Sequence, residues 1–432
     1  MRAQLLSGLA LAAVVLAGCE GHNGSPANQV GANPPLPGQN QYLVPPMHIA
    51  HPAKWNGAMP KVPQGLRIEA YADGFANVRS VYALPNGDVL AVEPKGPPQP
   101  IFRPKDILVN WIKGFGHSKT KGGDRITLLR DTNGDGKPDV RVTFLDHLHS
   151  PFGVVLVGND LYVANTDAIV RYPYQTGQTR ITAPGTLVTE LPGGPIDHHW
   201  TKSLTASPDG TKLYVGIGSN SNITENGMGA EFERARIWEV DRATGAHRPY
   251  ATGLRNPNGL NFYPGTNQLW VVVNERDELG PDLVPDYLTG VRPGAFYGWP
   301  YSYWGRHVDP RVQPQRPDMV AKATVPDYSL SSHVAPLGMV FNTGNALPAI
   351  YRGGAFIGEH GSWDRHDFNG YKVVFVPFTN GRPSGPPRDI VTGFLDEHNH
   401  ALGRPVGLAM DPTGALLIAD DVSNTIWRVT GG

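Results

Sequence analysis

The chain has 432 residues and is almost neutral, with 37 Lys and Arg against 38 Asp and Glu. A neutral chain has no long-range attraction for nucleic acid, so we expect no nucleic-acid partner. The single cysteine excludes a disulfide, a cysteine-based zinc site and a covalently attached c-type haem.

The N-terminus has the order of an export signal. Residues 1–2 supply a positive charge, residues 5–17 an apolar run, and the ending LAGC places small residues before Cys19. The apolar run is too short to span a membrane as a stable helix. Because LAGC resembles a bacterial lipobox, we expect Cys19 to carry a lipid anchor on the periplasmic side of a membrane of the bacterial cell envelope. An ordinary signal peptide with an incidental cysteine is the alternative.

Residues 20–59 are rich in Gly, Pro, Asn and Gln and contain few large apolar side chains. Such a composition buries too little apolar surface to offset its ordering entropy. We therefore predict a flexible tether over residues 20–59 and a folded domain over residues 60–432.

One pattern recurs in the folded domain: an apolar pair, a tight turn and an alternating apolar strand. Turns of Asn-Gly, Asp-Gly and Gly-Asn between alternating strands are strong β-hairpin signals. Six copies begin at Val81, Val154, Leu204, Leu260, Met339 and Leu408. Several are followed by a further strand, such as RIWEVD and TIWRVT. Three or four strands repeated six times, without helical periodicity, predict an all-β six-bladed β-propeller. Two packed sandwiches would not explain six copies of one hairpin.

Two segments between these strands are longer than a hairpin needs. They are Glu93–Asp124 and Asn274–Pro336, and we predict both as loops. Long loops on a rigid scaffold are where binding and catalysis usually lie.

A histidine pair precedes the third hairpin. If the segment IDHHWTKSL is extended, His198 and His199 send their rings to opposite faces, so at most one points into the central channel. Histidine has a pKa suited to accepting a proton near neutrality. Packing or surface exposure is the competing interpretation.

Three arginines stand at predicted blade entrances: Arg255 in GLRNPNG, Arg365 in HGSWDR and Arg404 in GRPVG. Guanidinium groups match carboxylate oxygens in a bidentate fashion, so the three could line an anionic pocket. Three solvated surface arginines are an equally good interpretation from the pattern alone.

Acidic and aromatic residues are concentrated between residues 273 and 304. Carboxylates in irregular chain suit Ca²⁺, although a solvated acidic loop would look the same. The aromatic rings could form platforms for a sugar, or they could be packed under the loop. The acidic residues are Glu275, Asp277, Glu278, Asp282 and Asp286, and the aromatic residues are Tyr297, Trp299, Tyr301, Tyr303 and Trp304.

The segment DTNGDGKPD has oxygen-bearing side chains at four positions of a calcium loop, beginning at Asp131, with Gly136 at the sixth position. Val142 stands where the closing Glu would be. We predict a β-turn between strands, with at most one structural Ca²⁺.

The motifs HHWTK, GLRNPNG, NERDELG, FYGWP, HGSWDR and GRPVG, in this order, resemble the sorbosone and pyranose dehydrogenase relatives of soluble quinoprotein glucose dehydrogenase. The likeness runs from about Gly65 to the C-terminus. It implies a six-bladed propeller that binds pyrroloquinoline quinone (PQQ) and Ca²⁺ and oxidises a sugar or sugar-derived aldehyde. Because there is no haem motif, it also implies an external electron acceptor.

Carried over residue by residue, the resemblance implies His199 as the general base. It implies Arg255, Asn256 and Arg404 as cofactor contacts, with Arg365 and Lys202 as further candidates. It places Ca²⁺ on backbone carbonyls of the segment Arg276, Asp277 and Glu278.

The sequence departs from the family pattern at Lys202, where Arg is frequent, and at Asp364, where Asn is common. These departures leave the substrate open. Two other functions remain: a Ca²⁺-dependent sugar lactonase and a non-catalytic propeller that binds glycans or peptides. Fold alone separates none of the three.

Overall fold

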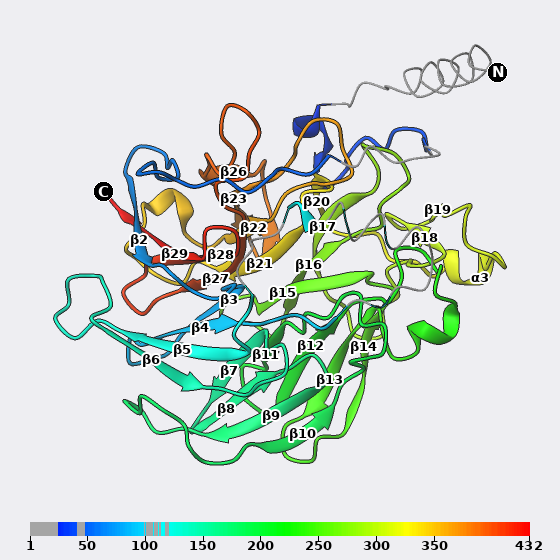
Figure 1. Cartoon of the computed structure of the whole chain (residues 1–432). Helices are drawn as coiled ribbons and strands as arrows, with labels where there is room; N and C mark the ends of the chain where they lie inside the picture. Colours follow the sequence, from blue (N-terminus) through cyan, green and yellow to red (C-terminus); the bar gives the residue numbers. More distant parts are fainter. Residues whose placement is uncertain are drawn as a thin grey trace, which may run out of the picture.

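The computed structural model describes residues 25–40, 48–98, 100, 107, 111, 114–116 and 121–432. In this part of the chain almost all regular structure is β-strand, and six main sheets are arranged around a common axis (Figure 1). The predicted fold class, a six-bladed β-propeller, is confirmed.

Blades 1 to 3 are antiparallel sheets whose strand order follows the chain. Blade 1 comprises β3 (Ser80–Ala83), β4 (Val89–Glu93), β5 (Arg125–Arg130) and β6 (Val140–Leu145). Blade 2 comprises β7 (Gly153–Val157), β8 (Asp160–Ala164), β9 (Ala168–Pro173) and β10 (Thr186–Glu190). Blade 3 comprises β11 (Leu204–Ala206), β12 (Lys212–Ile217), β13 (Arg236–Asp241) and β14 (His247–Thr252).

Blades 4 and 5 carry the longer insertions. Blade 4 comprises β15 (Asn256–Phe262), β16 (Leu269–Asn274), β17 (Pro285–Gly290), β20 (Tyr328–Ser332) and β1 (Val30–Gly31). Blade 5 comprises β21 (Pro336–Phe341), β22 (Ala355–Glu359), β23 (Lys372–Val376) and β26 (Arg388–Val391). Short elements outside the blades are β18 (Ser302–Tyr303), β19 (His307–Val308), β24 (Phe378–Thr379), β25 (Arg382–Pro383), η1 (Pro26–Gln29), η2 (Met228–Glu231), α3 (Pro317–Val320) and η3 (Ala349–Tyr351).

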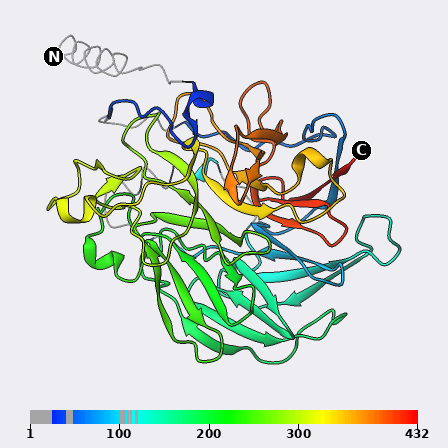
Figure 2. The ribbon, with the colours of Figure 1, turned by 180° about the vertical axis from the view of Figure 1, so that it is seen from behind.

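Blade 6 closes the ring by joining the two ends of the domain. Its inner strands are β27 (Pro405–Met410), β28 (Leu416–Asp420) and β29 (Thr425–Gly431), and its outer strand is β2 (Leu66–Ala72). β2 pairs antiparallel with β29 along almost its whole length. Figure 2 shows the closed ring from behind. Closure in this way leaves no free seam between the first and last blades.

Each predicted hairpin forms the two innermost strands of one blade. The hairpin turns of blades 1 and 3 place Gly87 and Gly210 at φ of +96° and +70°, a conformation that glycine adopts without steric cost. The second strands are buried throughout, for example VLAVE in β4 and LLIAD in β28. Apolar side chains of adjacent blades pack there against one another, and this packing forms the core. The predicted turn at Asp131 is also present, between β5 and β6.

The prediction that Asn274–Pro336 is one long loop is wrong. This segment contains β17 and β20, the two outer strands that follow β16 in blade 4. Both strands are fully buried. β17 (PDYLTG) lacks the alternation of apolar and polar residues that marked the other strands, and β20 (YSLSS) has only two large side chains.

The domain boundaries stay a prediction, but the described parts of residues 20–59, expected as a flexible tether, contact the propeller. β1 adds a short strand to the edge of blade 4, and the buried Gln29 side chain binds Asp282 O and the Ser332 hydroxyl. Further along, Trp55 packs edge-on against Trp427. Backbone pairing and a few anchoring side chains hold this segment, which its composition alone did not reveal. The lipid-anchor prediction at Cys19 lies outside the described residues, and no described helix has the length and hydropathy to cross a membrane.

Candidate active site

The predicted site residues lie on one face of the ring, which we call the strand-start face. It is formed by the residues that precede each innermost strand and by the connections between the second and third strands of the blades. Backbone hydrogen bonds join the segments that precede the innermost strands of neighbouring blades. Gly153 N donates to Lys202 O, and Gly407 N donates to Arg79 O. Ser219 N donates to Arg255 O and joins a connection of blade 3 to the start of β15. Residues far apart in sequence are thus brought together.

The segment that carries His198 and His199 is not an extended strand. Asp197 has a φ of +38°, in the left-handed region, and the following residues have no ladder partner. The two imidazole rings consequently stack, with centroids 4.9 Å apart and planes at 12°. The prediction that the rings point to opposite faces is therefore wrong, because strand alternation does not apply to this irregular segment.

His199 has the hydrogen bonding of a neutral base. Its Nδ1 lies 2.7 Å from Ser219 O, a carbonyl that can only accept, so Nδ1 carries the proton and Nε2 keeps its lone pair. Nε2 has no hydrogen-bond partner among the described residues. Burial lowers the pKa of His199 well below its ordinary value, and the charge of Arg255 lowers it further. The ring is therefore neutral at pH 7.

A buried ionic network holds this segment in place. The Asp197 carboxylate contacts Lys202 Nζ at 3.2 Å and Arg234 Nη2 at 2.8 Å, and it accepts the Thr166 hydroxyl proton. Arg234 also donates to His199 O at 3.1 Å. Burial lowers the pKa of Lys202 to about 7, although the negative charge of Asp197 acts to raise it. Among the described residues, Lys202 Nζ binds only Asp197 and Trp200 O, so Lys202 is left out of the proposed cofactor site.

Arg255 connects blade 3 to the acidic loop. Its guanidinium donates to Glu275 O at 2.7 Å and to Asn222 Oδ1 at 3.0 Å, and lies 3.4 Å from Asp277 Oδ2. Asn256 begins β15. A side chain at Gly218 would meet both His199 Cβ at 2.4 Å and Asn256 Oδ1 at 2.5 Å. Only glycine at this position allows the base and Asn256 to approach so closely.

Arg404 lies immediately before β27 and is buried over the ring of Tyr371, 5.0 Å from its centroid. Its Nε and Nη2 donate to the carbonyls of His360 and Gly361. Its Nη1 has no hydrogen bond within the described part of the chain. No described carboxylate pairs with this charge, so Arg404 is suited to an anionic ligand.

Sequence reasoning missed three residues beside Arg404. Arg79 stands before β3 as Arg404 stands before β27, and it binds Asp421 at 2.8 Å. His360 Nε2 lies 3.0 Å from the same Asp421 carboxylate. Burial, together with the nearby Arg404, lowers the pKa of His360 to about 4. The shared position of the two arginines relative to their strands was a signal that could have revealed Arg79.

The connection after β16 contains the predicted calcium segment. Asp277 N donates to Asn222 Oδ1 at 2.9 Å, and Asp277 O accepts from Asn222 Nδ2 at 3.1 Å. Glu278 points outward to Arg311 at 3.2 Å, and Arg276 is buried against Asp309 at 3.2 Å. The carboxylate of Asp277, in contrast, turns toward the blade 5 side of the face.

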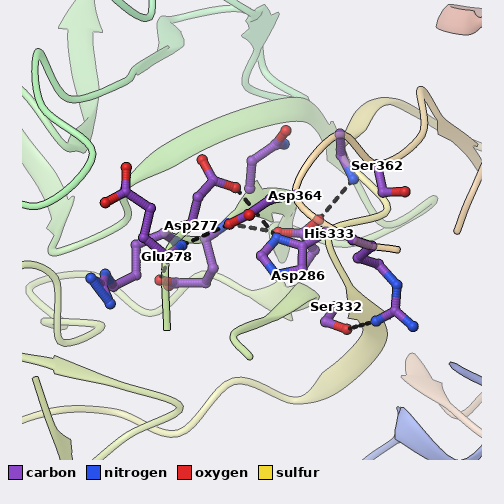
Figure 3. A network of polar contacts seen from close by, with 12 residues as sticks. Asp277, Glu278, Asp286, Ser332, His333, Ser362 and Asp364 are labelled. Atoms are coloured by element: carbon purple, nitrogen blue, oxygen red, sulfur yellow. Dashed lines mark hydrogen bonds and ion pairs between the residues drawn. The ribbon is translucent and has the colours of Figure 1, made fainter. Parts of the chain in front are cut away.

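There, Asp277 meets His333 and Asp364 (Figure 3). His333 Nδ1 is 3.3 Å from Asp277 Oδ1, and Asp364 Oδ2 accepts Glu278 N at 2.8 Å. Burial would lower the pKa of His333, but the hydrogen bond to Asp277 and the charge of Asp364 raise it to about 9. Burial raises the pKa of Asp364 to about 7. Sequence reasoning missed His333, which precedes the looser hairpin of blade 5.

Arg365 packs against the acidic loop that follows β16. Arg365 is fully buried and binds Asp282 at 2.9 Å and the Ser332 hydroxyl at 2.7 Å. Because Asp282 balances its charge, Arg365 is left out of the proposed cofactor site.

The prediction of exposed sugar platforms is wrong for four of the five rings, because they are packed beneath the loop. The packed rings are Tyr297, Trp299, Tyr303 and Trp304.

Matches to two known families identify the class to which this six-bladed propeller belongs. Residues 238–362 match the Glucose / Sorbosone dehydrogenase family. Residues 121–285 and 312–432 match the TrAA12-like family. The chain belongs to the TrAA12-like family, which confirms the resemblance inferred from the ordered motifs.

Individual relatives agree with this assignment. An uncharacterised protein of Borreliella burgdorferi is 28% identical over 299 residues, which cover 66% of this chain and 77% of that protein. The pyrroloquinoline quinone-dependent pyranose dehydrogenase of Coprinopsis cinerea is 25% identical over 335 residues, which cover 63% of this chain and 44% of that enzyme. The match therefore spans less than half of the enzyme's length.

Solved structures share the fold. A family AA12 carbohydrate-active enzyme of Trichoderma reesei superposes with a TM-score of 0.70 at 20% identity, covering 89% of this chain and 99% of that one. The holo PQQ domain of the Coprinopsis cinerea pyranose dehydrogenase gives a TM-score of 0.69 at 18% identity, covering 89% and 100%.

Proposed function

We propose that this chain is a PQQ-dependent dehydrogenase that oxidises a sugar or a sugar-derived aldehyde, with His199 as the general base. The observation that carries the proposal is the state of His199: a partly buried neutral imidazole whose Nδ1–H is fixed by Ser219 O and whose Nε2 has no hydrogen-bond partner among the described residues. Family membership and the activity named for the Coprinopsis cinerea relative support the same conclusion.

The residues fit a cofactor with several carboxylates. Within the described part of the chain, the guanidinium of the buried Arg404 hydrogen-bonds only to carbonyl oxygens, and its Nη1 is available for a charge-assisted hydrogen bond. Arg79 has a buried Nε without a hydrogen-bond partner among the described residues. Arg255 adds a third positive charge next to His199. Together these arginines would hold the anionic edge of PQQ.

The residues also fit Ca²⁺ in the segment 276–278. A carbonyl oxygen has two lone pairs, so Asp277 O can accept from Asn222 and still bind a cation. The nearby carboxylates supply the negative charge that a hard cation requires. When bound, PQQ would accept the hydride and Ca²⁺ would polarise its quinone oxygen.

The chain's own contribution is to position and deprotonate the substrate. Nε2 of His199 would take the hydroxyl proton of the sugar, or of the hydrated aldehyde. The low pKa of His199 keeps Nε2 unprotonated. Arg234, itself paired with Asp197, holds the segment by donating to His199 O. The hydrogen bond from Nδ1 to Ser219 O orients the ring.

The physiological setting is part of the proposal. Without a haem motif, the electrons would pass to an external quinone or cytochrome c. The lipobox-like ending at Cys19 would place this reaction at a membrane of the cell envelope. Replacing Cys19 with Ser should then abolish incorporation of a labelled fatty acid, and a wild-type chain that takes up no label would contradict the anchor.

Reconstitution tests the proposed activity. PQQ and CaCl₂ are added to the purified apoprotein, and dye reduction is followed over a panel of aldoses, pyranoses and sugar aldehydes. We expect reduction only with PQQ present and loss of activity in His199→Gln. Hydrolysis of sugar lactones without PQQ, or no dye reduction with any substrate, would contradict the proposal.

A further inference from the structure

Three side chains on the strand-start face converge at a point that the proposed reaction does not use. Asp277 comes from the connection after β16, His333 from the turn before β21, and Asp364 from the connection after β22 (Figure 3). One potential ligand atom from each lies within 4.8 Å of the other two. The group therefore bridges blades 4 and 5.

The orientation of His333 is that of a metal ligand. Its Nε2 lies 3.1 Å from Gly280 O, and a carbonyl can only accept, so this nitrogen donates and Nδ1 faces the carboxylates. Histidines that bind metals commonly donate the other ring N–H to a backbone carbonyl, which fixes the tautomer. His333 has a left-handed φ of +58° and is buried, so its position is set by the fold and not by solvent.

The carboxylates around this point outnumber the cations. Asp277, Asp364 and Asp286 are the acidic neighbours of His333, and burial raises the pKa of Asp364 and Asp286 to about 7. Asp286 accepts Glu275 N and Ala335 N at 2.7 Å each. The cations near these carboxylates are His333 itself, Arg255, which reaches Asp277 only at 3.4 Å, and Arg276, which is paired with Asp309. Buried carboxylates in excess of cations call for another positive charge.

We propose that Asp277, His333 and Asp364 form a side-chain site for a divalent transition-series cation of the Zn²⁺ class. Imidazole nitrogen is a favoured ligand of these ions, whereas Ca²⁺ prefers oxygen ligands, about six to eight of them. One nitrogen and two carboxylates, with Nε2 of His333 held by Gly280 O, form a compact set for the smaller ion. The site differs in its ligands from the backbone-carbonyl Ca²⁺ set proposed above, although both use the loop at Asp277.

Direct metal titration tests the site and requires neither PQQ nor a sugar. The full-length chain is made metal-free, and binding of Zn²⁺ and Ca²⁺ is measured by calorimetry, with bound metal counted by mass spectrometry. We expect one Zn²⁺ per chain, bound at least tenfold more tightly than Ca²⁺ at this site. Co²⁺ as a probe should give visible absorption bands that report a nitrogen ligand.

Variants assign the binding to these side chains. His333→Gln and Asp364→Asn should each weaken Zn²⁺ binding at least tenfold and weaken Ca²⁺ binding much less, because neither side chain is a ligand of the backbone-carbonyl set. Asp364→Asn keeps the shape of the side chain, so it remains informative if His333→Gln folds poorly. His400→Gln is the matched control, since this exposed histidine pairs with Asp396 far from the site.

Three results would overturn the proposal: no bound Zn²⁺, Zn²⁺ binding that is unchanged in both variants, or a preference for Ca²⁺. If no Zn²⁺ binds, His333 and Asp277 form an ion pair and not a metal site. None of these results bears on PQQ-dependent dye reduction, so the site can fail while the proposed activity stands.

Discussion

Two histidines on the same face of the ring, His199 partly buried and His333 buried, have opposite surroundings. His199, before β11, donates from Nδ1 to Ser219 O and lies near Arg255 and His198. His333, before β21, donates from Nε2 to Gly280 O and lies near Asp277 and Asp364. The pKa of His199 is well below its ordinary value, whereas that of His333 is raised to about 9.

The difference shows that burial has opposite outcomes for two histidines when the charges around them differ. Burial lowers the pKa of both rings; at His199 the charge of Arg255 acts in the same direction, whereas at His333 the carboxylates outweigh it. Burial and then its cationic neighbours keep His199 neutral and able to accept a proton. Anionic neighbours keep His333 cationic, or make it part of a cation site. Both histidines precede the innermost strand of a blade, and the segments that surround them differ.

The largest expected effect is on turnover. His199→Gln removes the base, and general-base removal typically lowers kcat by about 10²–10⁴-fold. PQQ affinity should change little, because His199 carries no charge at pH 7. Rates on a sugar that turns over, together with PQQ titrations, check both parts. His198→Gln is the matched control, and an equal loss of kcat in that variant would mean that the assignment of the base is wrong.

The next effect is on stability around His199. Asp197→Asn leaves Lys202 and Arg234 buried without their shared carboxylate, and breaking a buried pair costs about 3–5 kcal/mol. Lys202→Met should cost less, because Asp197 keeps Arg234. Urea unfolding of both variants measures the difference. Equal losses in the two variants would show that Asp197 does not organise this network.

Cofactor affinity should respond to Arg404. Arg404→Gln removes a charge-assisted hydrogen bond worth about 1.5–3 kcal/mol, which corresponds to about 10- to 150-fold weaker PQQ binding. Fluorescence titration of the apoprotein with PQQ measures this loss. Arg382→Gln, an exposed arginine paired with Asp327, is the control. Unchanged affinity for PQQ in Arg404→Gln would exclude Arg404 from the cofactor site.

The smallest effect is on pH dependence. The folded pKa of His199 lies below 6.5, so the neutral base persists as the pH falls through 6.5 and is lost only at lower pH. The acid limb of kcat/KM should therefore have its midpoint below pH 6.5. In Arg255→Gln, measured at saturating PQQ, the midpoint should move up toward 6.5. A wild-type midpoint above 6.5 would contradict the cationic surroundings described for His199.

Much of the fold could be predicted from the sequence because its signals are local. A glycine turn such as that at Gly87, between alternating strands, specifies a hairpin without reference to the rest of the chain. β17 and β20 were missed because they are buried on both faces and are separated by an insertion that contains β18, β19 and α3. The packing of β1 was missed because pairing with β20 depends on a partner about 300 residues away.

The candidate site could be predicted only where one residue carried its own motif. His199, Arg255 and Arg404 stand in recognisable segments, and the structure brings them to one face. The pairing of His333 with Asp277 and Asp364 requires three connections from two blades, which spacing does not reveal. The packing of Trp299 and Trp304 likewise depends on the depth of the core beneath the loop, which composition does not give.

The protonation state of His199 tests the central claim most directly. Nitrogen-15 NMR of histidine-labelled protein, with the His199→Gln spectrum used to assign the resonance, reports which ring nitrogen carries the proton. At pH 7 we expect a neutral ring with the proton on Nδ1 and a lone pair on Nε2. A doubly protonated His199 ring at pH 7, or a proton on Nε2, would contradict the account of this face.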